Sequence, residues 1–137
     1  MILLDTNVWS VQTKVRAERA VLDWLGAHAE EFLLSTIVIA EIRAGIENPD
    51  ASHLRTMLTQ WLQDIETRYH DRIVPLDAQA AHEFGRLISK RKLLSHQTKL
   101  LDAALAAQAL ALDCPIATHN TRDFEWTGVK LIDPWQA

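Results

Sequence analysis

The chain has 137 residues, of which 48% are hydrophobic, and a formal net charge of −4 at pH 7. This length and apolar content are enough for one domain, residues 1–137, that buries a core without disulfides or structural metal. The negative charge argues against a protein that coats nucleic acid through a uniformly basic surface, but it does not exclude an enzyme that acts on nucleic acid.

The short apolar runs and the single cysteine indicate the compartment. Cys114 has no second cysteine to pair with, so we expect a buried, inert thiol in a reducing environment. The first apolar run ends at Asp5, before it could serve as a signal sequence, and no later run approaches membrane-spanning length. We therefore expect a cytoplasmic protein with no membrane association.

The hydrophobic pattern alternates between short apolar runs and segments with helical spacing. In chain order it predicts a strand at 2–4, a helix at 16–28, a strand at 32–34, helices at about 36–47 and 51–69, a strand at 73–76, helices at 78–90 and 98–113, and strands at 115–118 and 130–132. Ser35 or Thr36 and Asp77 suit helix N-caps, and Pro75 favours an edge strand. Strands that alternate with helices, without tight hairpins, predict an α/β fold: a three-layer α/β/α sandwich with a central, mainly parallel sheet.

Polar clusters follow two of the predicted strands. Asp5-Thr6-Asn7 comes directly after the first strand, and the segment from Thr118 to Asp123 follows a late one. In open α/β sheets, ligands bind outside the carboxyl ends of the strands. An acid at one strand end is commonly a helix cap, so either cluster alone is weak evidence of a site.

Two further acids lie on apolar helix faces. Helical spacing places Glu41 with Ile37 and Val38, and it places Asp102 with Leu105 in the most apolar helix of the chain. An unpaired carboxylate on such a face is costly to bury, so these two acids carry the strongest physical argument for a shared cation. Separate salt bridges, such as one between Asp102 and Lys99, explain each acid equally well.

Carboxylate ligands favour a hard divalent cation, Mg²⁺ with Mn²⁺ as a substitute, and no histidine or cysteine pair has zinc spacing. We expect Asp5, Glu41 and Asp102 to be ligands, and Asp123 to bind directly or through water. Side chains that position ligands or phosphate are expected at Thr6, Asn7, Thr118 and Asn120. A segment without acids, 84–101, carries Arg86, Lys90, Arg91, Lys92 and Lys99. It is either a solvated helix end or a rim that contacts phosphates. Metal-assisted phosphodiester hydrolysis fits this combination.

The ordered motifs resemble a PIN domain, and in particular VapC-type toxins including the FitB-like branch. The resemblance rests on Ile-Leu-Leu-Asp-Thr-Asn-Val at 2–8, Ala-Glu-Ile at 40–42 with Gly45, Asp102 in an Ala-rich helix, Ala-Thr-His-Asn-Thr-Arg-Asp-Phe at 117–124, and Asp-Pro-Trp at 133–135. It implies a metal-dependent endoribonuclease with an acidic site at Asp5, Glu41, Asp102 and Asp123. It also implies a homodimer and an antitoxin that silences the toxin and binds operator DNA within the complex. His119 departs from the arginine of many relatives, and we interpret it as a rim residue.

Two other protein classes require residues that are not evident in this chain. A haloacid-dehalogenase-like phosphatase needs a second Asp where this chain has Asn7, and a receiver domain needs an early acidic pair that is not evident. A stronger alternative is a catalytically weak PIN-like module that acts as part of a DNA-binding regulatory complex with its antitoxin. Because the site is anionic, we expect the antitoxin to carry a basic segment whose Arg or Lys competes with metal.

Overall fold

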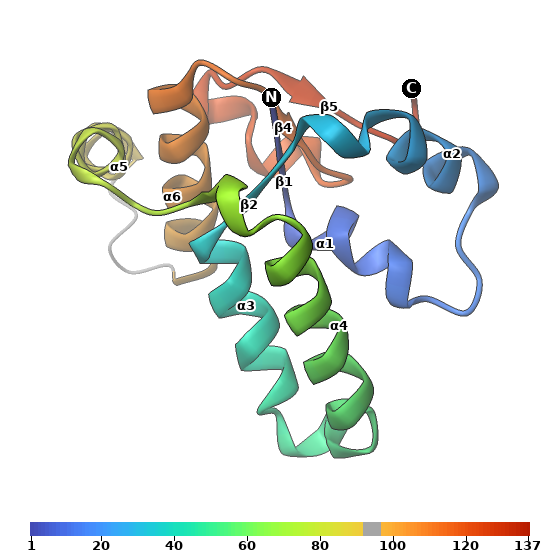
Figure 1. Ribbon diagram of the computed structural model, residues 1–137. Coiled ribbons are helices and arrows are strands. Elements are labelled where there is room, and N and C mark those ends of the chain that lie inside the picture. Colours follow the sequence, from blue (N-terminus) through green and yellow to red (C-terminus); the bar gives the residue numbers. More distant parts are fainter. Residues whose placement is uncertain (92–96) are drawn as a thin grey trace.

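A parallel sheet forms the centre of the computed structural model, which describes residues 1–91 and 97–137, with the side chains of residues 91 and 97–99 outside that description (Figure 1). Its strands are β1 (Ile2–Leu4), β2 (Phe32–Ser35), β3 (Ile73–Val74), β4 (Ile116–Ala117) and β5 (Leu131–Ile132). They lie in the order β3-β2-β1-β4-β5, and each paired neighbour is parallel. The predicted parallel α/β architecture is therefore confirmed, and β3, which ends just before Pro75, lies at an edge as predicted.

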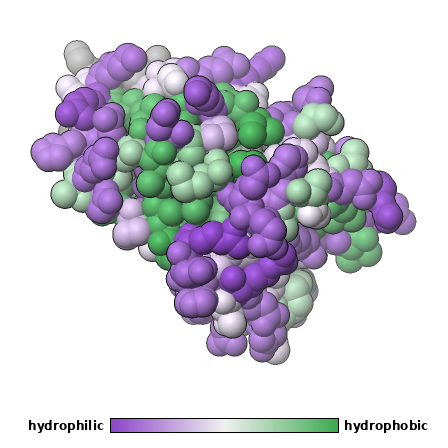
Figure 2. Space-filling model, turned by 45° about the horizontal axis from the view of Figure 1, so that its top comes forward, coloured by the Kyte–Doolittle hydropathy of each residue, from purple (hydrophilic) through white to green (hydrophobic). Residues whose placement is uncertain are grey.

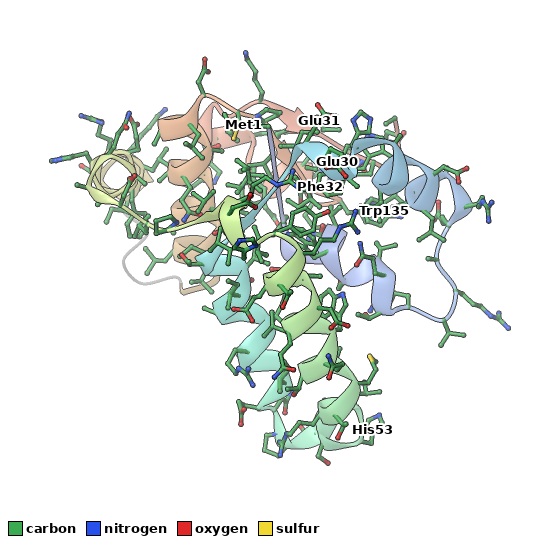
Figure 3. The ribbon with its side chains drawn as sticks, viewed as in Figure 1. Met1, Glu30, Glu31, Phe32, His53 and Trp135 are labelled. Atoms are coloured by element: carbon green, nitrogen blue, oxygen red, sulfur yellow. The ribbon has the colours of Figure 1, made fainter. Side chains whose placement is uncertain are left out.

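Helices cover this sheet and extend beyond it. They are α1 (Thr6–Trp9), α2 (Arg19–His28), α3 (Thr36–Ile46), α4 (Arg55–Arg68), α5 (Ala78–Arg91) and α6 (Gln97–Leu112). Short 3₁₀ turns are η1 (Ser10–Thr13), η2 (Ala29–Glu31), η3 (Pro49–Leu54), η4 (His70–Arg72), η6 (Thr121–Asp123) and η7 (Glu125–Thr127). In Figure 1, α3 and α4 form a hairpin that projects away from the sheet, and Figure 3 places His53 at its tip. The sequence pattern missed α1, which is too short to show helical periodicity.

The predicted helix caps are present as hydrogen bonds. Ser35 Oγ accepts from Ile37 N at 3.0 Å at the start of α3, and Asp77 Oδ1 accepts from Ala80 N at 2.9 Å at the start of α5. Each bond satisfies a backbone N–H that has no partner within its own helix. Asp77 is therefore a structural cap, as expected, and the chain turns from strand to helix at Ser35 because that side chain replaces a backbone acceptor.

The core is built on β1, β2 and the helices that pack against them. All three residues of β1 and all four of β2 are buried. Trp9 makes edge-on contacts with Phe32 and Tyr69, with ring centroids 5.9 and 5.2 Å apart. Cys114 is buried as expected, and its burial raises the pKa of the thiol. Among the described residues, no helix is long and apolar enough to cross a membrane.

The two ends of the strands lead to different features. At the amino ends, a groove of about 400 Å³ is lined by Met1, Leu33 and Leu112 and also by the charged residues Glu30, Glu31, Asp71 and Arg72. Hydrophobic side chains gather on the face seen in Figure 2, which brings this end of the molecule forward. The carboxyl ends instead lead into α1, α3 and the turn before η6. Because all the strands run the same way, these polar segments begin at one edge of the sheet.

Candidate active site at the carboxyl ends of the strands

Asp5 ends the first strand and is the most buried acid described, with only 7% of its surface exposed. It also caps α1, because its Oδ1 accepts from Thr6 N at 2.8 Å. Its Oδ2 accepts from Thr118 Oγ1 at 2.8 Å and from Asn7 Nδ2 at 3.3 Å. These bonds hold the carboxylate in one orientation at the sheet edge.

The clusters that follow β1 and β4 form one hydrogen-bonded network. Asn7 Oδ1 accepts from His119 N at 3.1 Å, and Asn7 Nδ2 lies 3.4 Å from Thr118 Oγ1. Thr118 Oγ1 in turn accepts from Asn120 N at 3.0 Å. The neighbouring positions of β1 and β4 in the sheet bring these segments together, although more than 100 residues separate them in the sequence. These bonds bring Asn7, Thr118, His119 and Asn120 together at this edge, with His119 and Asn120 joining through their backbone N–H groups.

Glu41 faces the same edge from α3. Thr6 Oγ1 donates to Glu41 Oε1 at 3.2 Å, so Thr6 connects the carboxylates of Asp5 and Glu41. Burial raises the pKa of Glu41, and the negative charge of Asp5 raises it further, against the opposing effect of the Thr6 bond. Asp5 is close enough to Glu41 for its negative charge to disfavour the charged form of Glu41.

Asp123 lies in η6 and is half-buried. Burial is the main cause that raises the pKa of Asp5, the bonds from Thr118 and Thr6 oppose it, and the charge of Asp123 adds to it. The backbone carbonyl of Asp123 accepts from Trp126 Nε1 at 3.0 Å, which fixes the turn. Asp123 is thus an electrostatic neighbour of Asp5.

Asp102 is half-buried on α6, whose position beside α3 is fixed by a buried side-chain bond. Ser35 Oγ donates to Gln108 Oε1, and Gln108 Nε2 donates to the Val74 carbonyl at 3.0 Å. Glu41 and Asp102 are each six residues from this bond. At 1.5 Å per residue each acid is about 9 Å from it along its helix axis. The helix α3 runs away from the carboxyl end of β2, whereas α6 runs antiparallel to the strands before the chain enters β4. Glu41, after Ser35 in α3, and Asp102, before Gln108 in α6, are therefore both displaced toward the carboxyl edge.

The carboxylates of Asp5 and Glu41 are not neutralised by a cation among the described residues. The donors to Asp5 are uncharged, and within the described residues neither Asp5 nor Glu41 forms an ion pair. No set of three or more acids, histidines or cysteines in the described part of the chain is close enough to hold an ion together. Mg²⁺ is commonly bound by only one or two carboxylates while several waters remain. The pair formed by Asp5 and Glu41 fits that requirement.

The predicted basic rim is described only in part. Arg86 and Lys90 are exposed on α5, and Arg86 Nη1 lies 3.0 Å from Glu83 Oε1. Lys92 and the side chains of Arg91 and Lys99 lie outside the described residues. For Arg86, the ion pair is what a solvated helix face would form, so a role of this segment in phosphate contact stays a prediction.

Gln108 has a structural role that the sequence pattern did not predict. Its side chain is fully buried and links the ends of β2 and β3 to α6. The available signal was a single uncharged polar residue within the Ala- and Leu-rich part of the helix, since a polar group on an apolar helix needs a partner when it is buried.

Comparisons with known proteins match the whole chain. A family model described as PIN domain matches residues 2–129. Plasmid stability protein StbB of Pseudomonas syringae pv. tomato is 36% identical, with 100% of both chains covered. VapC ribonuclease Y4jK of Sinorhizobium fredii is 35% identical over 99% of each chain. A crystal structure of FitAcB from Neisseria gonorrhoeae has a TM-score of 0.79 and 30% identity over 100% of both chains. A structure of FitAB bound to an IR36 DNA fragment has the same TM-score, with 29% identity over 98% of this chain and 96% of that chain.

Proposed function

We propose that this chain, which belongs to the PIN domain family of VapC- and FitB-like toxins, is a magnesium-dependent endoribonuclease that hydrolyses RNA phosphodiester bonds. The observation that carries the proposal is the buried carboxylate of Asp5, oriented by neutral donors and joined through Thr6 to Glu41. A relative that is 35% identical is named a VapC ribonuclease, which supports RNA as the substrate.

The acids and their neighbours have separate roles in this proposal. Asp5 and Glu41 hold the cation, and Asp102 and Asp123 complete the acidic set from α6 and η6. Mg²⁺, or Mn²⁺ in its place, supplies a charge that acidifies an attacking water and neutralises negative charge that develops on the phosphoryl oxygens. Thr118 and Asn7 keep the Asp5 carboxylate aimed at the sheet edge, so its lone pairs are oriented before substrate arrives.

Cleavage of purified cellular RNA tests this function. The wild-type chain is expected to cleave with Mg²⁺ and to stop when the ion is chelated, while Asp5→Asn and Glu41→Gln reduce the rate. We expect losses at least as large as the roughly 10–100-fold that follows removal of a group supporting a metal ligand. Glu47→Gln is the matched control, since Glu47 caps the exposed end of α3, where it pairs with Arg43 at 3.5 Å.

Two results would refute the assignment. The first is equal degradation by Asp5→Asn and the wild type, which would indicate a contaminating nuclease. The second is no degradation by the wild type at high enzyme concentration with either cation. The second result would favour the alternative, a catalytically weak PIN-like module that acts within a DNA-binding complex. The similar FitAB structure, which is bound to DNA, supports this alternative.

The toxin role implies partners. We infer a cytoplasmic single-domain protein, residues 1–137, that forms a homodimer and is silenced by an antitoxin, with DNA contacted only through the complex. The antitoxin is expected to place an Arg or Lys against Asp5 and Glu41, because these acids lack a cationic partner within the described chain. A complex with no basic side chain within reach of the acids would contradict this mode. The α4 surface, where Met57 is 45% exposed, is a candidate contact for a second subunit or the antitoxin.

A further inference from the structure

A separate hollow of about 270 Å³ adjoins the acidic edge. Its lining includes Asn7, His119 and Asn120 of the network, together with Lys14, Arg16 and Trp135. Asn7 belongs to both places, since its side chain also contacts Asp5 Oδ2 at 3.3 Å. Figure 3 shows Trp135 on the side of the molecule that carries α1 and α2, far from His53 at the hairpin tip. The hollow is therefore one side chain away from the acids.

Two aromatic rings form one wall of this hollow. The rings of His119 and Trp135 lie with centroids 4.0 Å apart and an angle of 37° between their planes. Asp133 Oδ1 accepts from Trp135 N at 2.9 Å and lies 3.5 Å from His119 Nδ1, so one carboxylate fixes both residues. His119 N also donates to Asn7 Oδ1, and half of the His119 side chain is exposed. The pair is thus held in place while its surface stays accessible, which is what a stacking platform requires.

Cationic side chains form another part of the hollow. Lys14 and Arg16 are exposed in the segment between η1 and α2, and neither forms an ion pair in the part of the chain that the structure describes. One acid, Glu18, also lines the hollow. The two free cations suit a phosphate and disfavour the basic segment expected of the antitoxin.

We propose that this hollow binds one unpaired nucleotide of the RNA next to the bond that is cut, with its base on the His119–Trp135 pair and its phosphate at Lys14 and Arg16. The inference rests on the proposed ribonuclease function, and it adds how a single-stranded substrate is held. Unpaired bases are the part of RNA that stacks on aromatic side chains, whereas a duplex buries its bases. The hollow therefore suits an unpaired base next to the cleavage site.

Equilibrium binding tests the proposal without any cleavage. The full chain, with a chelator present, is titrated into a fluorescent six-nucleotide single-stranded RNA and into a matched ribose-phosphate oligomer without bases, and anisotropy is followed. We expect the RNA with bases to bind about tenfold more tightly, within the range found for one stacked base. Trp135→Ala should remove this preference, and Trp135→Phe should keep most of it. His53→Ala, a histidine change at the distant hairpin tip, should alter neither affinity.

The cationic contact has its own signature. Lys14→Ala should weaken the binding of the two oligomers by the same factor. It should also reduce the magnitude of the slope of log association constant against log salt concentration by about 0.7, the value for one lost phosphate contact on a single strand. Lys130→Ala is the matched control because Lys130 is exposed just before β5, at the amino end of the strand.

The outcomes separate this inference from the proposed function. No preference for the oligomer with bases, or a preference that survives Trp135→Ala in a chain that still melts cooperatively, overturns the nucleotide site. The same conclusion follows if the hollow receives a partner protein's side chain, because RNA binding would then be unchanged in Trp135→Ala and Lys14→Ala. RNA binding that depends on Trp135 in a wild-type chain that never cleaves would retain the site and refute only the ribonuclease.

Discussion

Replacing Gln108 with leucine should destabilise the protein even though the side-chain volume changes little. Gln108 is fully buried and bonds to Ser35 Oγ and to the Val74 carbonyl. Leucine leaves the buried Ser35 hydroxyl without its acceptor, which costs about 1–3 kcal/mol, and leaves the half-buried Val74 carbonyl without its donor, which costs less. We expect the free energy of unfolding to fall by about 2–4 kcal/mol.

The same change should reduce RNA cleavage, although Gln108 is remote from the acids. The bond between Ser35 and Gln108 fixes the start of α3 against α6, and Glu41 and Asp102 are each six residues farther along these helices. A shift of about 1 Å in a positioned group can cost a hundredfold in rate. A loss of about tenfold or more is expected in cleavage at a temperature where the variant remains folded.

Urea denaturation and the RNA cleavage assay check both parts. Gln79→Leu is the matched control, because Gln79 is exposed and its Nε2 reaches the Ala111 carbonyl only at 3.4 Å. It should change stability by less than about 0.5 kcal/mol. A double-mutant cycle with Ser35→Ala should show strong coupling, since each single change removes the same bond. Stability effects that simply add, or a Gln108→Leu variant as stable as the control, would refute the reasoning.

Other predictions follow from the buried groups. The folded-state pKa values of Asp5 and Glu41 are raised above their ordinary values of 3.8 and 4.5. Their contribution to stability is therefore present at low pH and lost as the pH rises through the folded pKa values. Urea denaturation with a chelator present should show this loss of stability, and the Asp5→Asn variant should show a smaller loss. Mg²⁺ at 100 times its Kd should raise the free energy of unfolding by about 2.7 kcal/mol at pH 8. Equal pH dependence of stability in Asp5→Asn and the wild type would contradict the linkage. Thr118→Val removes the 2.8 Å hydrogen bond to Asp5. The free energy of unfolding should fall by about 1–3 kcal/mol at pH 8, and by less at low pH, where Asp5 is protonated. A loss of stability that does not depend on pH would show that the hydroxyl does not act through Asp5. Trp9 Nε1 is buried without a hydrogen-bond partner among the described groups. Trp9→Phe should therefore lower the free energy of unfolding by less than about 1.5 kcal/mol, whereas Trp9→Ala should lower it by about 3–5 kcal/mol. Similar thermal stabilities for these two variants would contradict this account.

Local signals in the sequence determined most of the element pattern. Period and turn chemistry depend on neighbouring residues, so they predicted the five strands, the cap at Asp77 and the edge position of the strand that precedes Pro75. They did not predict α1, because Asp5-Thr6-Asn7 reads equally well as the end of a strand or as a helix cap. The motifs also identified the family, since their order along the chain is specific.

The tertiary structure decided how the acids differ from one another. Helical spacing predicted the largest burial cost at Glu41 and Asp102, yet both are half-buried and Asp5 is the buried acid. Burial depends on which elements pack over a residue, and Asp5 lies beneath contacts from the Thr118 segment, which is more than 100 residues away in sequence.

The sequence by itself thus determined which carboxylates are available, the helices that carry Glu41 and Asp102, and the family to which the chain belongs. Only the tertiary structure decided that Thr6 links Asp5 to Glu41, that Asp123 acts on Asp5, and that His119 stacks on Trp135. The reason is physical: hydrophobic period and capping act between residues a few positions apart, whereas hydrogen bonds, desolvation and charge repulsion act between groups that the parallel sheet brings to one edge.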